Sequence, residues 1–149
     1  MQGYNVLMVY SEDLHKVLMC RRLKEPYKGL SNFVGGKIES GESGMEAAYR
    51  ELFEETGIPW EAIVFHHLMD YKYYLQDCYV EVYVGRLKYD VEILGDENDL
   101  YWSGLDEDFF NMSLFAGEGN IAHMIEQVKM YEEKIFNVHT DQLHMLEKG

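Results

Sequence analysis

Three glutamates near the middle of the chain, Glu51, Glu54 and Glu55, have the spacing of side chains that share one face of a helix. At about 100° per residue, positions three and four apart fall within one arc. Like charges this close repel one another, and more strongly when they are partly buried. An arginine partner or a divalent cation would remove that repulsion. Because hard carboxylate oxygens select Mg²⁺, Mn²⁺ or Ca²⁺ rather than zinc, the spacing favours a site for a hard cation.

The segment that carries these glutamates, Met45–Thr56, is predicted to be a helix, with Gly57 and Pro59 as its stop signal. Arg50, one turn before Glu54, is the candidate arginine partner. A stripe of apolar residues beside the acidic arc predicts packing against a sheet, which would place the carboxylates at the edge of the core. The stripe consists of Met45, Ala48, Tyr49 and Leu52. A solvent-facing acidic helix would show the same spacing, so the surrounding residues must decide between the two.

Glycines on both sides of the helix complete a longer pattern. The segment from Gly36 to Ile58 reads GKIESGESGMEAAYRELFEETGI and resembles the Nudix box, G-x5-E-x7-R-E-U-x-E-E-x-G-U, where U is a bulky aliphatic residue. Every specified position is matched, in order by Gly36, Glu42, Arg50, Glu51, Leu52, Glu54, Glu55, Gly57 and Ile58. Since few short motifs are as specific, the chain is identified as a member of the Nudix hydrolases.

The resemblance implies a metal-dependent pyrophosphohydrolase with Mg²⁺ or Mn²⁺ as its cofactor. In similar enzymes, glutamates at the positions of Glu51, Glu54 and Glu55 bind the metal. A carbonyl oxygen at the position of Gly35 or Gly36 often adds a ligand. Bound metal lowers the pKa of a water molecule, which then attacks phosphorus in line.

The resemblance also implies roles for two charged residues of the box and for a general base. The arginine at the position of Arg50 typically orients a box glutamate, whereas the glutamate at Glu42 is more peripheral. The general base, which takes the proton from the attacking water, varies within the family. Glu51 is one candidate, and a downstream acid is another. Glu97, in the acidic loop 96–99, is our first choice for that downstream acid.

Cations gather before the box although the chain as a whole is acidic, with a net charge of −14. Glu25 is the only acid between Lys16 and Lys37, a stretch with six lysines and arginines. Such a patch suits a small phosphorylated ligand, although a solvated loop would have the same composition. The overall charge argues against a nucleic-acid polymer or an anionic membrane as partner. The candidates for holding phosphate charge are Arg21, Arg22 and Lys37.

The approach to the box, N-x-x-GGK from Asn32 to Lys37, resembles that of MutT-like enzymes that hydrolyse oxidised purine nucleoside triphosphates. There the asparagine contacts the purine, and in some members a tryptophan near the end of the sheet stacks on the base. Trp102 is the analogous residue here. The implied reaction converts a triphosphate, such as 8-oxo-dGTP, to a monophosphate and pyrophosphate. Without the resemblance, Asn32 could equally be a turn residue and Trp102 a core aromatic.

Other Nudix branches remain as alternatives. Dinucleoside polyphosphate (Ap4A-type) hydrolases often have a tyrosine at the spacing of Tyr74, but tyrosines crowd this region and suit strands generally. ADP-ribose hydrolases often have a proline about 15 residues past the box, and this chain has only Pro26 and Pro59, which disfavours that branch. Non-catalytic, nucleotide-sensing Nudix modules usually have a damaged box, whereas this box is complete.

The elements around the box predict one α/β domain, a mixed α/β sandwich, over residues 1–137, followed by a polar tail, 138–149. The resemblance implies that this domain is a Nudix-like α/β/α sandwich with a mixed sheet. A second helix is expected over Ile121–Ile135, where apolar residues recur at helical spacing. Strands are expected at Asn5–Tyr10 and Lys16–Cys20, which could form a hairpin, and at Asn32–Gly36, Ile63–Leu75, Tyr79–Leu87 and Leu100–Trp102.

Composition adds several expectations about the setting. No apolar run approaches the roughly 18–20 residues of a membrane span, and the first ten residues do not resemble a signal peptide. The two cysteines, Cys20 and Cys78, are not in CxxC spacing, so neither a zinc site nor a disulfide framework is supported. We therefore expect a cytoplasmic monomer or homodimer that acts on a small nucleotide.

Overall fold

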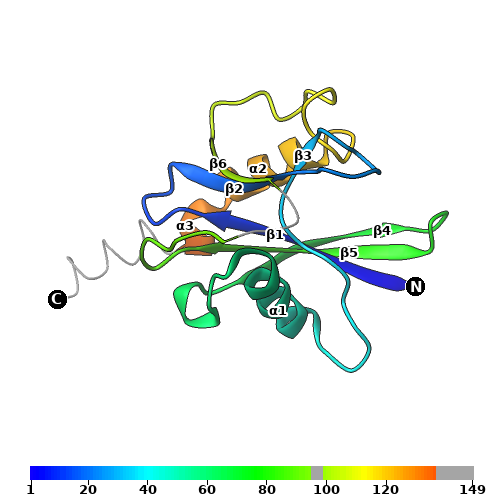
Figure 1. Cartoon of the computed structure of the whole chain (residues 1–149), viewed down its shortest axis with the longest axis horizontal. Coiled ribbons are helices and arrows are strands. Elements are labelled where there is room, and N and C mark those ends of the chain that lie inside the picture. Colours follow the sequence, from blue (N-terminus) through cyan, green and yellow to red (C-terminus); the bar gives the residue numbers. More distant parts are fainter. Residues whose placement is uncertain (95–98, 137–149) are drawn as a thin grey trace.

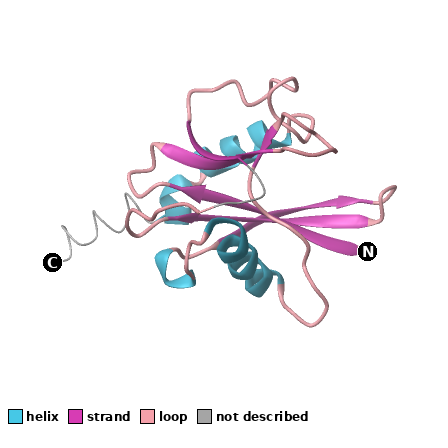
Figure 2. Ribbon diagram, viewed as in Figure 1, coloured by secondary structure: helices cyan, strands magenta, loops and turns pink. Residues whose placement is uncertain are grey.

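The computed structural model describes residues 1–94 and 99–136, which form a mixed β-sheet with helices on both faces (Figure 1; Figure 2). The strands pair in the order β3-β2-β1-β5-β4, and β6 pairs with the other side of β2. The strands are β1 (Gln2–Tyr10), β2 (Lys16–Arg21), β3 (Ser31–Asn32), β4 (His66–Tyr73), β5 (Cys78–Arg86) and β6 (Asp99–Gly104). The helices are α1 (Gly44–Thr56), the short 3₁₀ helix η1 (Trp60–Ala62), α2 (Asn120–Met130) and α3 (Glu132–Phe136).

The centre of the sheet is a parallel pair, β1 and β5, in register from Gln2↔Cys78 to Tyr10↔Arg86. All other strand pairs are antiparallel, so the sheet is mixed, as expected. Strands buried on both faces read as continuous apolar runs, which explains why β1 contains the sequence VLMVY. The expected hairpin of β1 and β2 forms, but its ladder is confined to Tyr10↔Val17. Further along β2, Cys20 and Arg21 pair with β3 instead.

The helices cover the two faces separately. Figure 1 shows α1 below the sheet and α2 and α3 on its other side. On the α1 side, Leu7, Leu18 and Leu52 belong to one buried cluster. On the opposite side, Met8, Ile121 and Ile125 belong to a second. Two apolar layers separated by one sheet confirm the α/β/α sandwich.

One predicted strand, Asn32–Gly36, is shorter than expected. Regular pairing with β2 ends at Asn32, whose Oδ1 accepts the N–H of Phe33 at 2.8 Å. The chain then changes partner, because β1 and β2 have diverged, and bridges β1 at Val34↔Leu7 and Lys37↔Tyr4. This change of partner brings the glycines before the box against the central strand.

The predicted helix Ile121–Ile135 is interrupted at Tyr131, where φ is −117° and ψ is 20°. Its N–H is shared between the carbonyls of Gln127 and Val128, at 3.2 Å each. The chain resumes as α3, which keeps Ile135 buried in the core. Glu97 and the polar tail 138–149 lie outside the described residues. Among residues 1–94 and 99–136, no helix has the length and apolar character to cross a membrane.

Candidate active site

Helix α1 is fixed at both ends by its own sequence. Ser43 caps the first turn by accepting the N–H of Glu46 at 3.1 Å, and the Glu46 carboxylate accepts the N–H of Ser43 at 2.9 Å. Gly57 ends the helix with φ of 79°, a left-handed conformation that favours glycine. Leu52 is fully buried under the sheet. The capped helix therefore presents its acidic arc at the edge of the core, as predicted from the spacing.

Arg50 holds the box carboxylates together. Its Nε and Nη2 donate to the two oxygens of Glu42, at 3.0 and 2.6 Å. Its Nη1 donates to both Glu51 and Glu54, at 3.1 Å each, and Nη2 also donates to the carbonyl of Lys37 at 3.0 Å. The expected pairing of Arg50 with a box glutamate is thus present three times. Glu42, expected to be peripheral, makes the forked contact, which is the strongest geometry for such a pair.

The two innermost carboxylates respond to this environment in opposite directions. Burial raises the pKa of Glu51, against the lowering effect of Arg50, and Glu54 and Glu39 add to the rise. Hydrogen bonds from Arg50, with one from the Glu39 backbone, lower the pKa of Glu42 to about 2. Glu42 is therefore a firmly ionised partner, whereas Glu51 binds a proton more readily than an ordinary glutamate.

The depressed pKa of Glu42 predicts a pH dependence of stability. Its contribution is present above the ordinary value of 4.5 and is lost as the pH falls towards about 2. Glu42→Gln should therefore flatten the dependence of unfolding free energy on pH across that window. Urea titrations at successive pH values measure the slope. A slope equal to that of the wild type would contradict the ion pair between Arg50 and Glu42. Glu126→Gln, which removes one exposed acid elsewhere, is the control for the change in net charge.

Gly36 lies directly against the Glu51 carboxylate of the acidic arc. A Cβ at this position would be 2.5 Å from the carboxyl carbon of Glu51, so any larger residue here would displace that carboxylate. The N–H of Gly36 donates to Oδ1 of Asn5 at 2.9 Å, and its carbonyl accepts the N–H of Asn5 at 2.8 Å. That carbonyl retains a second lone pair, so its predicted role as a metal ligand is compatible with the bond.

A pocket of about 320 Å³ lies beside this glycine. Five predicted site residues line it: Arg22, Asn32, Gly36, Lys37 and Glu55. Sequence reasoning missed two further polar groups of its wall, the side chains of Asn5 and Tyr4. In the sequence, Asn5 is visible only as a polar residue at the start of an apolar run. Its role could not be predicted because residues 34–37 lie beside it only in the folded protein.

Two other predicted residues lie elsewhere. Arg21, the last residue of β2, lines a different pocket from its neighbour Arg22. It pairs with Asp99 at 3.5 Å and lies 5.5 Å from the centre of the Tyr101 ring. Trp102 is opposite Leu18 and half-buried against the α1-side cluster, outside the lining of the 320 Å³ pocket. Of the residues predicted to bind the substrate, Asn32, Arg22 and Lys37 therefore line the 320 Å³ pocket. Arg21 and Trp102 do not line it.

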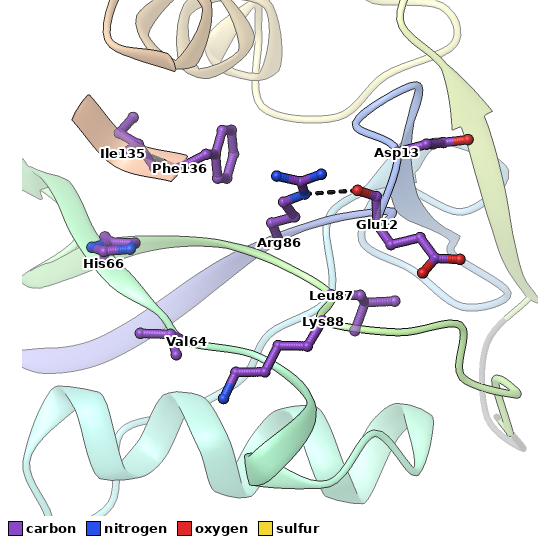
Figure 3. Close-up of a pocket in the computed structure, with 9 residues that line it drawn as sticks. All are labelled: Glu12, Asp13, Val64, His66, Arg86, Leu87, Lys88, Ile135 and Phe136. Carbon is purple, nitrogen blue, oxygen red and sulfur yellow. Dashed lines mark hydrogen bonds between the residues drawn. The ribbon is translucent and has the colours of Figure 1, made fainter. Parts of the chain in front are cut away.

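The larger cavity, about 710 Å³, lies at the other end of the central strands. It surrounds Arg86, whose Nε donates to the carbonyl of Glu12 at 2.7 Å, while the carboxylates of Glu12 and Asp13 point away from the guanidinium (Figure 3). None of the described residues predicted for the site lines this cavity. The 320 Å³ pocket is the candidate substrate pocket, because five of the predicted site residues line it.

The donors at this site fit a hard divalent cation in kind. Glu51 and Glu54 already converge on one cationic nitrogen of Arg50, and oxygen donors of this type suit Mg²⁺ and Mn²⁺. Over residues 1–94 and 99–136, however, no three His, Cys, Asp or Glu side chains form a ready-made metal cluster. Binding of a metal would therefore be accompanied by movement of side chains such as the exposed Glu54 towards the ion.

Known proteins resemble the chain in sequence and in fold. A stretch of 61 residues is 36% identical to an NAD-capped RNA hydrolase of Schizosaccharomyces pombe, covering 41% of this chain and 16% of that one. Another of 47 residues is 43% identical to an ADP-ribose pyrophosphatase of Methanocaldococcus jannaschii, covering 32% and 28%. The chain thus matches less than a third of the length of either relative.

Among solved structures, an Ap4A hydrolase of C. elegans superposes with a TM-score of 0.72 at 17% identity, over 91% of this chain and 100% of that one. At this identity the likeness concerns the fold alone. The family model of the NUDIX domain matches residues 1–108, which include β1 to β6 and the whole of α1. Together with the complete box, this match confirms the family expected from the sequence: the chain belongs to the NUDIX domain family.

Proposed function

We propose that this protein hydrolyses a diphosphate bond in a nucleotide, with a divalent cation held by Glu51, Glu54 and Glu55. The observation that carries the proposal is the convergence of Glu51 and Glu54 on one nitrogen of Arg50, directly beside Gly36. Two carboxylates that share one cationic partner keep a net negative charge. A divalent ion therefore binds to the pair more favourably than to one carboxylate alone.

Each residue then has a defined part in the reaction. A bound metal would supply an activated water and neutralise diphosphate oxygens. Glu51, which lies against Gly36, is one candidate for the base that takes the proton of the attacking water. Glu97 remains the other predicted base. Lys37 and Arg22 line the pocket and hold the charge of the leaving group. Arg22 is oriented for this by its Nε, which donates to the carbonyl of Pro26 at 2.8 Å.

The preferred substrate in this proposal is a purine nucleoside triphosphate, cleaved to a monophosphate and pyrophosphate. The pocket of about 320 Å³ is near the lower end of the usual 300–1,000 Å³ for ligand sites, which suits one nucleoside better than two. Asn32 lies in its wall, where its amide can read a base edge. An Ap4A-type substrate is the second candidate. Because the relatives are named for different substrates, those substrates are included in the hydrolysis screen.

A hydrolysis screen tests the proposal directly. The protein is incubated with Mg²⁺ or Mn²⁺ and with 8-oxo-dGTP, normal dNTPs, Ap4A, ADP-ribose, NAD-capped RNA and CDP-alcohols, and the products are identified. Release of pyrophosphate from a triphosphate supports the preferred reaction, whereas formation of ATP from Ap4A supports the second. No metal-dependent turnover of any substrate would overturn the proposal and favour a nucleotide-sensing module.

Metal binding should also be visible in stability. A ligand at 100 times its dissociation constant stabilises the folded state by about 2.7 kcal/mol, or roughly 5–10 °C in Tm for a chain of this size. We expect Mn²⁺ to produce such a shift in the wild type and a much smaller one in Glu54→Gln. Thermal unfolding with and without the metal measures both. Equal shifts in the two proteins would remove Glu54 from the metal site.

Base recognition can be divided between the two predicted contacts. Because stacking on an aromatic ring contributes on the order of 1–3 kcal/mol, Trp102→Ala should lower kcat/KM for the preferred purine roughly 5- to 150-fold if the base stacks there. Asn32→Ala should reduce discrimination between bases while hydrolysis persists. Steady-state kinetics with a purine and a pyrimidine triphosphate separate these effects. Loss of stability with unchanged base preference would make Trp102 a core residue, as its half-buried position also allows.

A further inference from the structure

Asn5 is a polar residue in the central strand, and its side chain is only 3% exposed. It binds both backbone polar groups of Gly36. Its Oδ1 accepts the Gly36 N–H at 2.9 Å, and its own backbone N–H donates to the Gly36 carbonyl at 2.8 Å. The second bond belongs to any residue at this position, whereas the first requires the amide. The Asn5 side chain therefore holds the backbone of Gly36 at the point where this glycine lies against the Glu51 carboxylate.

The contact continues from Gly36 to the catalytic helix. Gly36 lies so close to the Glu51 carboxyl group that a Cβ would be 2.5 Å from its carbon atom. On the far side, Arg50 donates to Glu51 and to the carbonyl of Lys37, at 3.1 and 3.0 Å. The Glu51 carboxylate is thus confined between Gly36 and Arg50, and the glycine is fixed by Asn5. A shift of Gly36 would move the surface against which Glu51 rests.

The amide is an unfavourable choice for the fold by itself. Its Nδ2 is buried and has no hydrogen-bond partner among the described residues. A buried donor without an acceptor destabilises the folded state, and β-branched apolar residues are preferred in a central strand. Within the described part of the chain, the bond from the Gly36 N–H is the side-chain interaction that favours asparagine here.

We propose that Asn5 is a positioning residue of the active site, which sets the place of the Glu51 carboxylate at the metal through its side-chain bond to Gly36. The inference rests on the proposed function, since it concerns the same metal site. Positioning contacts behind metal ligands typically change metal affinity or activity 10- to 100-fold when removed.

The test compares Mn²⁺ binding and catalysis in three proteins. Mn²⁺ titrations followed by electron paramagnetic resonance, without substrate, give the metal affinity of the wild type, Asn5→Val and Asn120→Ala. The control, Asn120, is an amide at the start of α2, on the opposite face of the sheet, whose Nδ2 donates to the Tyr73 hydroxyl at 2.8 Å. We expect about a 10- to 100-fold weaker Mn²⁺ affinity and a lower kcat for Asn5→Val, and wild-type values of both for Asn120→Ala.

Thermal unfolding of the metal-free proteins completes the test. Valine removes the unsatisfied Nδ2 donor and suits the strand, but it also leaves the Gly36 N–H without its acceptor. Because these two effects on stability oppose each other, Tm should change little in Asn5→Val although metal binding weakens. Wild-type Mn²⁺ affinity and kcat in Asn5→Val would overturn the positioning role alone, as would a lowered Tm with unchanged affinity of the folded protein. Failure of the wild type itself to bind Mn²⁺ or hydrolyse any nucleotide would instead overturn the proposed function.

Discussion

Glu54→Gln is expected to lower kcat by about 100- to 1,000-fold at saturating Mg²⁺, because losing a metal ligand removes several kcal/mol of transition-state stabilisation. The fold should survive the change. The Glu54 side chain is 57% exposed, and within the described part of the chain its hydrogen bond comes from Arg50 at 3.1 Å. Arg50 would still hold Glu42 and Glu51. Steady-state kinetics and thermal unfolding of the same preparations measure the two effects separately.

The matched control for this variant is Glu126→Gln, which removes one exposed acid from α2 on the opposite face of the sheet. It makes the same change in net charge without touching the box. Activity in the control should equal that of the wild type. Near-normal, Mg²⁺-dependent turnover in Glu54→Gln would refute the assignment of Glu54 to the metal site, whatever the substrate is.

Arg50→Gln should have the largest effect on stability among the box residues. Arg50 is the shared partner of Glu42, Glu51 and Glu54, and without it the half-buried Glu51 keeps its charge with no compensating cation. Hydrogen bonds to charged groups contribute about 1.5–3 kcal/mol, so we expect a loss of about 3 kcal/mol and a fall in Tm of roughly 6–12 °C in metal-free protein. Catalysis should fall as well, because the carboxylates lose their orientation.

Two comparisons make the Arg50 prediction specific. Arg50→Lys keeps the positive charge but cannot make the forked contact with Glu42, so it should recover only part of the lost stability. Arg86→Gln removes an arginine with a single carbonyl contact and should change Tm little. Mn²⁺ should stabilise Arg50→Gln, because the ion replaces the missing positive charge. A metal-free Tm equal to that of the wild type would show that the cluster contributes nothing to folding.

The parts of the site that could be predicted from the sequence are those determined within one element. The acidic arc of α1, its end at Gly57 and the burial of Leu52 all follow from spacing along a single helix. The contact of Arg50 with Glu54 follows from the same spacing. Its stronger contact with Glu42 does not, because Glu42 precedes the helix and reaches Arg50 only through the path of the loop before it.

The parts that were missed depend on pairing between distant segments. Asn5 acquires its role only because β1 and β2 diverge and residues 34–37 fill the space beside β1. Arg21 and Arg22 read as one basic patch, yet they project towards different pockets. The interruption of the second helix at Tyr131 likewise has no glycine or proline to announce it. In each case the structure depends on contacts with segments that are distant in the sequence, so the local sequence alone could not predict it.

The parallel pairing of β1 with β5 has a consequence for how the chain folds during synthesis. The central strand β1 leaves the ribosome well before its parallel partner β5, which ends only at Arg86. Until then β1 exposes an apolar segment whose ladder cannot form, and contacts between residues this far apart in sequence make folding slow. Ribosome-bound chains that stop before β5 should therefore bind chaperones and be sensitive to protease, even though the capped helix α1 is already complete.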